Sequence, residues 1–321
     1  MKVGGEVKKI IKAEIQTVRD KEALIISDLG DMSLRDTLEC GQAFRYEELE
    51  REENYIEYLT VFMERLVIVG QRKPGELIFY GMNMDDLPRL VGYFGLDLDY
   101  SAVREMIADR TDSDWMKRAA DVSRGIHILK QDAWEALFSF IISQNNNIPR
   151  IRKIIRRLAA EYGENLAQKQ GITSCPKGLC DNVGGEACRG CGICYSFPTA
   201  EAVAREPEKM LSSNPGFRYK YLLDAARRVH TGECDLAAIE RLDSFEKIME
   251  ELKKILGVGD KVASCVALFG MGRLEAFPID VWMKRAIDEY FGGRLDHTVF
   301  GDYAGVAQQY IFHYIRNLSE K

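Results

Sequence analysis

Residues 252–265 read LKKILGVGDKVASC, and this stretch decides how the second half of the chain folds. Its spacing predicts an apolar helix that ends at Leu256, a tight turn over residues 257–259, and a second helix that begins near Asp260. The two glycines of the turn let the backbone bend sharply and let a phosphate approach without interference from a Cβ atom. The N-terminus of the second helix offers unpaired N–H groups and a positive dipole end to that phosphate. The stretch therefore predicts a helix-hairpin-helix that contacts a DNA backbone, with an ordinary corner between two helices as the alternative.

Two residues near this turn have the character of catalytic groups. Lys261 lies at the start of the second helix, and residues 276–282, AFPIDVW, place Asp280 about twenty residues further on. The helix dipole and burial both favour the neutral form of the Lys261 amine, which is the nucleophilic form. A carboxylate at Asp280 would stabilise positive charge on a sugar as its N-glycosidic bond breaks. Taken singly, each residue also fits a simpler role, a phosphate contact for Lys261 and a helix N-cap for Asp280.

The composition is that of a folded protein, and the length suggests two domains, or one large domain with an appendage. The chain has 321 residues, of which 46% are apolar and 29% are charged. Its net charge of −6 argues only weakly against nucleic-acid binding, because the charge is spread unevenly. Residues 147–160 carry five basic and no acidic side chains, whereas residues 40–59 carry six glutamates. The sequence therefore allows one basic face that contacts phosphates.

The sequence contains no segment typical of a membrane or secreted protein. No apolar run reaches the roughly 20 residues that a membrane helix needs. The first residues, MKVGGEVKKIIKAE, have no apolar signal-peptide core. We expect a monomeric cytoplasmic protein with no membrane partner, associated with the nucleoid if its source is bacterial or archaeal.

The periodicity of the apolar residues predicts an α+β fold. Residues 1–112 are expected to form an N-terminal antiparallel β-rich domain, with strands over residues 55–69 and 76–80 and a helix over residues 85–94. From residue 113 the apolar spacing becomes helical, so residues 113–321 are expected to form an all-α domain. The expected helices cover residues 115–124, 133–142, 148–162, 196–228, 244–256, 261–269, 281–291 and 302–318.

A Cys-rich insertion at about residues 171–195 interrupts the helical pattern. Its cysteines have the spacing C-x4-C-x7-C-x2-C-x2-C, and two-residue spacings let thiolates converge on one metal ion. Zinc is the expected metal, an iron–sulfur cluster is the second choice, and a loop of free thiols is the third reading. The metal would be structural, held by four of the five residues Cys175, Cys180, Cys188, Cys191 and Cys194.

The hairpin, the lysine and the downstream aspartate together resemble the helix-hairpin-helix DNA glycosylase superfamily. Within it, four further segments resemble the 8-oxoguanine DNA glycosylases. These segments are GQAFRY at residues 41–46, SQNNNIPRI at 143–151, NPGFRY at 214–219, and AGVAQ at 304–308 followed by Phe312. The resemblance covers most of the chain apart from the Cys-rich insertion, and Lys261 resembles the nucleophile of the bifunctional members.

The resemblance implies a pocket for the damaged base. The carbonyl group of Gly41 would accept a hydrogen bond from N7–H, which 8-oxoguanine has and guanine lacks. Gln308 would bind the Watson–Crick edge of the base, and Phe312 would stack on its ring. Cys265 would form the opposite wall, although it is equally well explained as a small buried residue.

The resemblance also implies how the chain holds a duplex whose damaged base is flipped out. Asn145 would fill the vacated space, Phe217 would act as a wedge in place of the usual Tyr, and Arg150 and Arg218 would read the orphaned cytosine. Further DNA contacts would come from Gly257, Gly259 and Trp282, the last of which stands where many relatives have His.

The implied function is a DNA repair enzyme that acts on double-stranded DNA containing oxidised guanine. It would excise 8-oxoguanine, preferably opposite cytosine, through a Schiff base on Lys261, then cleave the abasic strand by β-elimination, with no cofactor for catalysis. One alternative is a related glycosylase of the endonuclease III or alkyladenine type, which the segment at residues 41–46 and the Gln308/Phe312 pair disfavour. The other alternative is a non-catalytic DNA-binding module, which the spacing of Lys261 and Asp280 disfavours.

Overall fold

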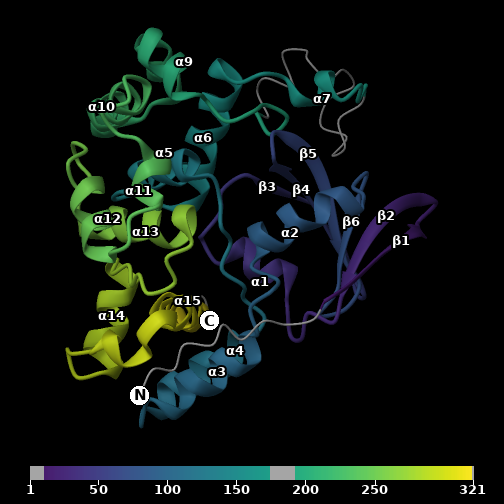
Figure 1. Cartoon of the computed structure of the whole chain (residues 1–321), viewed down its shortest axis with the longest axis vertical. Helices are drawn as coiled ribbons and strands as arrows, with labels where there is room; N and C mark the ends of the chain where they lie inside the picture. Colours follow the sequence, from purple (N-terminus) through teal and green to yellow (C-terminus); the bar gives the residue numbers. More distant parts are fainter. Residues whose placement is uncertain (1–10, 174–191, 320–321) are drawn as a thin grey trace.

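The computed structural model describes residues 11–173 and 192–319. A sheet-containing part and a helical part lie side by side, with the strands on one side of the molecule and most of the helices on the other (Figure 1). The predicted α+β fold is therefore confirmed. No helix in the described residues is long and apolar enough to span a membrane.

Six antiparallel strands form one sheet in the order β1-β2-β6-β5-β4-β3. One face of this sheet is covered by α1 (Leu34–Glu39) and α2 (Leu87–Phe94), which bury Leu24, Phe79 and Phe94. The short helix η1 (Met84–Asp86) precedes α2. The strands are β1 (Lys12–Val18), β2 (Lys21–Ser27), β3 (Tyr46–Glu52), β4 (Tyr55–Phe62), β5 (Arg65–Gln71) and β6 (Leu77–Tyr80).

The strand predicted over residues 55–69 is instead a hairpin of two strands. Met63 and Glu64 both have positive φ angles, 52° and 53°, and Phe62 pairs with Arg65 across the turn. Two successive residues with positive φ form a turn whose twist matches antiparallel strands. Neither residue is a Gly, Asn or Asp, so the sequence carries no ordinary turn signal there.

The helical part is built around α13, which is buried from Val262 to Met271. It packs against α5 so closely that a Cβ atom added to Gly270 would lie 2.9 Å from the Cβ atom of Ala136. The α-helices are α3 (Tyr100–Asp109), α4 (Asp114–Val122), α5 (Ala133–Ser143), α6 (Ile148–Tyr162), α7 (Leu166–Lys169), α9 (Ala200–Arg205), α10 (Tyr219–His230), α11 (Leu236–Glu240), α12 (Phe245–Leu252), α13 (Asp260–Met271), α14 (Val281–Tyr290) and α15 (Ala304–Ser319). The 3₁₀ helices are η2 (Pro207–Ser213), η3 (Gly216–Arg218) and η4 (His297–Tyr303).

Two predicted helices are shorter than expected. The helix over residues 196–228 is broken into α9, η2, η3 and α10, because Asn214 and Gly216 have positive φ angles and Pro215 lies between them. The helix expected to end at Leu256 ends at Leu252. The Leu256 amide donates instead to Asp224 at 2.8 Å, so a turn leads into the hairpin.

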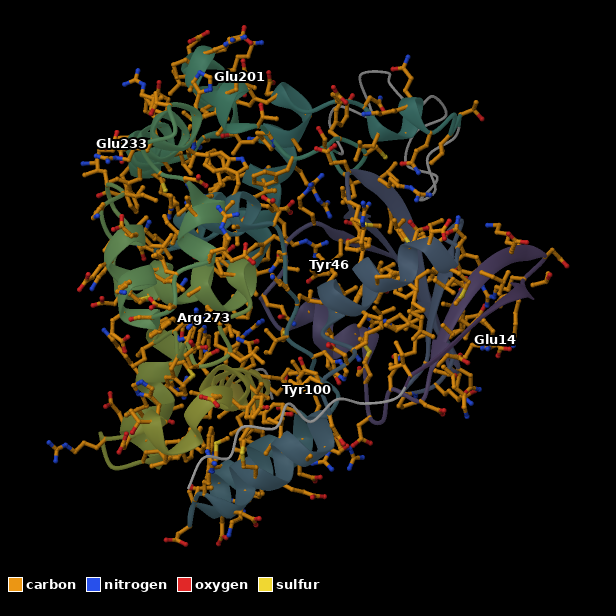
Figure 2. All side chains as sticks on the ribbon, in the orientation of Figure 1. Glu14, Tyr46, Tyr100, Glu201, Glu233 and Arg273 are labelled. Atoms are coloured by element: carbon orange, nitrogen blue, oxygen red, sulfur yellow. The ribbon has the colours of Figure 1, made fainter. Side chains whose placement is uncertain are left out.

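The two parts share an extended junction. Leu59 and Leu66 of the sheet are buried against Leu166 and Ala167 of α7. Tyr46 also lies at this junction (Figure 2), and its carbonyl group accepts hydrogen bonds from Arg152 and Arg156 of α6. The domain boundary after residue 112 stays a prediction. The helix α3 lies before that boundary, and its buried residues belong to the core of the helical part. Residues 174–191 of the Cys-rich insertion lie outside the described residues.

Candidate active site

The two glycines of the hairpin have different roles. Gly257 has a φ of +80°, and a Cβ atom there would lie 2.4 Å from Cγ of Tyr221, so no other residue fits. Gly259 is exposed, with nothing within 4 Å of the place where its Cβ would be. It is the N-cap of α13, and within the described residues no side chain caps the first N–H groups of this helix. The hairpin therefore leaves an uncovered helix N-terminus of the kind that binds phosphate.

Lys261 lies in the first turn of α13 and is half-buried against α5. Its Nζ atom donates to the hydroxyl oxygen of Ser143 at 2.9 Å and lies 5.3 Å from the centre of the Phe140 ring. Ser143 in turn donates to the Phe140 carbonyl at 2.8 Å. The end of α5 thus holds the amine in one place. The sequence does not predict this role for Ser143, which forms part of the SQNNNI run but carries no signal of its own.

Asp280 caps α14, as its position before that helix predicts. Its Oδ1 atom accepts a hydrogen bond from the Met283 amide at 2.9 Å, which fixes the carboxylate at the helix N-terminus. Among the described residues, Oδ2 makes no hydrogen bond. The neighbours on either side, Ile279 and Val281, are 37% and 76% exposed, so this end of α14 borders open solvent. One carboxylate oxygen therefore remains for another partner.

The charges of both Lys261 and Asp280 affect the Cys265 thiol. Cys265 is buried one turn after Lys261 on α13, and burial raises the pKa of its thiol to about 11. The Lys261 charge lowers that pKa and the Asp280 charge raises it, so both groups act on the same atom. No ion pair joins Lys261 to Asp280 in the part of the chain that the structure describes. With a pKa of about 11, the Cys265 thiol stays protonated and neutral at ordinary pH.

Gly41 and Phe312 meet although they are 271 positions apart. Gly41 has a φ of +89°, and a Cβ atom there would lie 3.3 Å from the Phe312 ring. The buried Gln42 fixes this segment, donating to the carbonyl groups of Thr37 and His127 at 2.8 Å each and accepting from the Leu129 amide at 2.9 Å. The structure therefore brings together these two residues of the expected base pocket.

The helix α15 carries both Phe312 and Gln308 of the expected base pocket. Gln308 is 3% exposed, and its Oε1 atom accepts a hydrogen bond from Nε2 of Gln309 at 2.9 Å. At the start of α15, the Gly305 amide donates to the Leu274 carbonyl at 2.7 Å. This contact ties α15 to the segment that leads to Asp280. The sequence singled out Gln308 but not Gln309.

The loop after α5 carries the residue expected to fill the vacated space. Asn145 is exposed and has a φ of +47°, which Asn tolerates better than most residues. Arg218, only 2% exposed, holds this loop from behind: Nε donates to the Gln144 carbonyl at 2.8 Å and Nη2 donates to the Asn145 carbonyl at 2.8 Å. Phe217 is 52% exposed, with the Arg218 guanidinium 4.5 Å from its ring centre.

The two arginines expected to read cytosine differ in environment. Arg150 is exposed near the start of α6. Arg218 also donates from Nη1 to the Pro215 carbonyl at 3.2 Å and from Nη2 to the Gln144 carbonyl, which leaves one Nη1 hydrogen unused in the described residues. Burial, with a smaller effect of Arg150, lowers the pKa of Arg218 below its ordinary value. Arg218 is thus mainly a scaffold for the loop, with one donor left for a base.

The basic run on α6 is only partly available to DNA. Arg152 and Arg156 pair with Glu47 of the sheet. Arg150, Lys153 and Arg157 are exposed. The basic face is therefore narrower than the sequence indicates. Trp282, half-buried on α14, lies with its ring 5.9 Å from the Arg285 guanidinium.

The metal prediction falls mostly on residues that the structure does not describe. Cys175, Cys180, Cys188 and Cys191 lie outside the described residues. Cys194 is described and is 1% exposed, in an apolar cluster with Leu59 and Leu66. Within residues 11–173 and 192–319, no group of three or more candidate ligands could hold a metal ion.

The chain is similar to proteins described as 8-oxoguanine DNA glycosylases or N-glycosylase/DNA lyases. Residues 24–137 match the family model of the 8-oxoguanine DNA glycosylase N-terminal domain. The structure of MBOgg1 in complex with a low-affinity DNA ligand is 34% identical, with 96% of this chain and 99% of that chain covered and a TM-score of 0.79. The Clostridium acetobutylicum 8-oxoguanine glycosylase/lyase, in complex with double-stranded DNA containing cytosine opposite 8-oxoG, is 30% identical, with coverage of 98% and 99% and a TM-score of 0.78. The N-glycosylase/DNA lyase of Saccharomyces cerevisiae is 28% identical over 276 residues, which are 80% of this chain and 67% of that protein.

Proposed function

The chain belongs to the 8-oxoguanine DNA glycosylase family, and on this premise we propose how its own residues remove the base and cut the strand. It is a bifunctional repair enzyme, a DNA N-glycosylase with lyase activity. Its substrate is double-stranded DNA in which 8-oxoguanine lies opposite cytosine. The proposed reaction uses no cofactor, since Lys261 and Asp280 carry its chemistry.

Lys261 is the nucleophile in this proposal. Its amine attacks C1′ of the flipped nucleotide, the N-glycosidic bond breaks, and the bonding electrons leave with the base. The Asp280 carboxylate stabilises the positive charge that develops on the sugar. Loss of a proton from nitrogen and opening of the sugar ring give an imine between Nζ and C1′. The imine makes the 2′ protons acidic, so removal of one expels the 3′ phosphate and breaks the strand.

One observation carries this assignment: the end of α5 holds the Lys261 amine in place through the 2.9 Å hydrogen bond from Nζ to the Ser143 hydroxyl oxygen. In the described residues Asp280 keeps one carboxylate oxygen without a hydrogen bond, at an end of α14 whose neighbouring residues are exposed. The position of Lys261 beside the uncovered N-terminus of α13 is also favourable. A phosphate held there would bring the sugar of its nucleotide close to the amine.

The base pocket is proposed to comprise Gly41, Cys265, Gln308 and Phe312. The proximity of Gly41 to Phe312 supports it, because the residue whose carbonyl would read N7–H lies beside the ring that would stack on the base. Gln308 supplies a buried amide for the Watson–Crick edge. Cys265 supplies a neutral apolar surface, since burial keeps its thiol protonated.

The proposed DNA contacts are assigned to residues whose side chains or backbone groups are exposed at the site. Asn145 and Phe217 protrude where a plug and a wedge are needed, and exposed Arg150 is the main reader of the orphaned cytosine. At the hairpin Gly257 forms the turn, and the N–H groups that follow Gly259 hold one backbone phosphate. Trp282 contacts the 5′ phosphate through its indole N–H in place of an imidazole.

A lesion panel tests the function and the pocket together. Duplexes with 8-oxoguanine, thymine glycol or ethenoadenine, each opposite its normal partner, are incubated with the enzyme, and we expect a nick only at 8-oxoguanine. In the variant Gln308→Ala, excision of 8-oxoguanine should slow by an amount equivalent to about 1–3 kcal/mol, because a buried hydrogen bond to the base is lost. The exposed residue Leu318 on the same helix gives the control Leu318→Ala. Nicking of the other lesions at similar rates, or unchanged kinetics in Gln308→Ala, would contradict the assignment.

A structural zinc ion in the Cys-rich insertion is a separate proposal. Four of Cys175, Cys180, Cys188, Cys191 and Cys194 would bind it, and it would stabilise a segment too polar to fold on apolar burial alone. Elemental analysis of anaerobically purified protein should give about one zinc per chain, and absorbance near 400 nm would indicate an iron–sulfur cluster instead.

Substitution separates a bound zinc from surface contamination. The double variant Cys188→Ser with Cys191→Ser should lose the metal. The variant Cys234→Ser, at a buried cysteine outside the insertion, should retain it. Substoichiometric zinc and iron in the wild-type protein would exclude the site and leave the glycosylase assignment intact.

A further inference from the structure

Two adjacent glutamines on α15 form a side-chain pair beside the base pocket. Gln308 and Gln309 are each 3% exposed, and Nε2 of Gln309 donates to Oε1 of Gln308 at 2.9 Å. Within the described residues, the buried Oε1 atom of Gln309 has no hydrogen-bond partner. Leaving a buried amide oxygen unsatisfied costs about 1–3 kcal/mol. An apolar residue would avoid that cost, so the second amide calls for a functional explanation.

The hydrogen bond between the glutamines sets the polarity of Gln308. A glutamine amide has an acceptor end and a donor end, and packing alone distinguishes them poorly. With Oε1 accepting from Gln309, its second lone pair and both Nε2 hydrogens remain for a ligand. Rotating the Gln308 amide by half a turn would bring its NH₂ group against the NH₂ group of Gln309. Gln308 is thereby oriented before any base arrives.

We propose that Gln309 is a positioning residue that fixes the amide of Gln308 in the orientation that accepts 8-oxoguanine and rejects 8-oxoadenine. This inference rests on the proposed function, in which Gln308 faces the Watson–Crick edge. Both bases have N7–H, so the Gly41 carbonyl cannot tell them apart. At their Watson–Crick edges the polarity is opposite: 8-oxoguanine presents the acceptor O6 and the donor N1–H, whereas 8-oxoadenine presents an N6 donor and the acceptor N1.

A fixed amide discriminates between these two edges. In its set orientation, Gln308 accepts from N1–H and donates to O6, so 8-oxoguanine satisfies both ends. With 8-oxoadenine, acceptor faces acceptor and donor faces donor, and the buried groups remain unpaired. If the amide were free to turn, it could match either base, and discrimination would fall. Selectivity therefore depends on what holds Gln308, and in the described structure that is Gln309.

The variant Gln309→Met tests the proposal, because it removes the donor and keeps a similar volume. Single-turnover excision is measured for 8-oxoguanine and 8-oxoadenine, each opposite cytosine, with binding of a duplex that carries a tetrahydrofuran abasic site. We expect the ratio of the two excision rates to fall about 5–10-fold, the effect of one net hydrogen bond. Binding of the abasic duplex should not change, because it contains no base to read. An unchanged ratio, or equal losses on both lesions and on abasic binding, would overturn the proposal.

A second variant keeps the test valid if Gln309→Met folds poorly. In Gln309→Glu the introduced carboxyl group donates to Gln308 when protonated, as the amide does, and only accepts when ionised. The rate ratio of this variant should therefore rise towards the wild-type value as pH falls. A ratio that is independent of pH would contradict the mechanism.

A double-mutant cycle separates this proposal from the proposed pocket. In a Gln308→Ala background, Gln309→Met should have no further effect on the ratio, since there is no amide left to orient. If Gln308→Ala itself leaves excision unchanged, the pocket assignment fails. If Gln308→Ala slows excision but Gln309→Met leaves the ratio intact, the pocket stands and only the role of Gln309 is wrong.

Discussion

The Nζ atom of Lys261 lies 2.9 Å from the hydroxyl oxygen of Ser143. Ser143 has one hydroxyl hydrogen, and it is donated to the Phe140 carbonyl at 2.8 Å. Towards Lys261 the hydroxyl group can therefore only accept. An amine that donates one hydrogen to Ser143 directs its lone pair elsewhere, which is what a nucleophile positioned for C1′ requires.

The variant Ser143→Ala should therefore slow base excision by about 5-fold, the effect of one net hydrogen bond, while duplex binding stays close to wild type. Single-turnover excision and a binding titration measure the two effects. Ser264→Ala is the matched control: Ser264 is buried on α13, and within the described residues its hydroxyl group makes one hydrogen bond, to the Met249 sulfur at 3.9 Å. Equal rates in Ser143→Ala and wild type would show that Ser143 does not position the amine.

The hairpin glycines should respond differently to alanine. In Gly257→Ala the new Cβ would overlap the Tyr221 ring in a backbone with positive φ, so we expect the free energy of unfolding to fall by about 2 kcal/mol or more. Gly259→Ala meets nothing within 4 Å, so the protein should keep its stability but bind duplexes more weakly. Urea unfolding and a DNA titration on both variants measure this. Equal stability losses would contradict the division between packing and phosphate contact.

Alanine substitution of the two arginines expected near the orphaned cytosine should have different effects on stability and on opposite-base preference. Arg150→Ala should leave the melting temperature unchanged and reduce the preference for cytosine over adenine opposite the lesion, because this exposed guanidinium is free to contact a base. Arg218→Ala should lower the melting temperature and slow excision opposite either base, because it removes the bonds that hold the Asn145 loop. The reverse pattern, with Arg218→Ala affecting only opposite-base preference, would show that Arg218 is the main reader.

The chemistry of the site could be predicted from sequence where one motif carries it. The Gly257-to-Lys261 hairpin and the N-cap position of Asp280 both follow from local spacing, and the structure has them as expected. The meeting of Gly41 with Phe312 could be expected only through the family resemblance, since no periodicity relates the two ends of the chain.

Other features depend on packing that local sequence does not encode. Nothing in the SQNNNI run indicates that Ser143 faces Lys261, because the contact depends on how α5 packs against α13. The burial of Arg218 could not be predicted for the same reason: an arginine in a stretch predicted to be helical resembles a surface residue until its carbonyl partners are known. The hairpin at Met63 and Glu64 has turn geometry without the residues typical of turns. The pairing of β4 with β5 therefore determines where the chain turns.

The Cys265 thiol should make stability depend on pH. Burial raises its pKa in the folded state to about 11, against 9.0 as the ordinary value. A raised folded-state pKa contributes stability that is fully present below pH 9 and is lost as pH rises towards 11. Between pH 8 and pH 10 the stability difference between wild type and Cys265→Ala should narrow by about 1 kcal/mol. Urea unfolding at both pH values measures it, and a difference that stays constant would show that the thiol titrates normally.

Borohydride trapping of the imine tests the central claim, the covalent role of Lys261, most directly. The enzyme is incubated with a duplex containing 8-oxoguanine opposite cytosine, sodium borohydride is added, and the adduct is located by peptide mass spectrometry. Wild-type protein should give a covalent enzyme–DNA adduct at Lys261. Lys261→Gln should bind the duplex but give no adduct, while Lys253→Gln, at an exposed lysine before the hairpin, should trap as wild type does. An adduct in Lys261→Gln, or one mapped to another amine in the wild-type protein, would contradict the account.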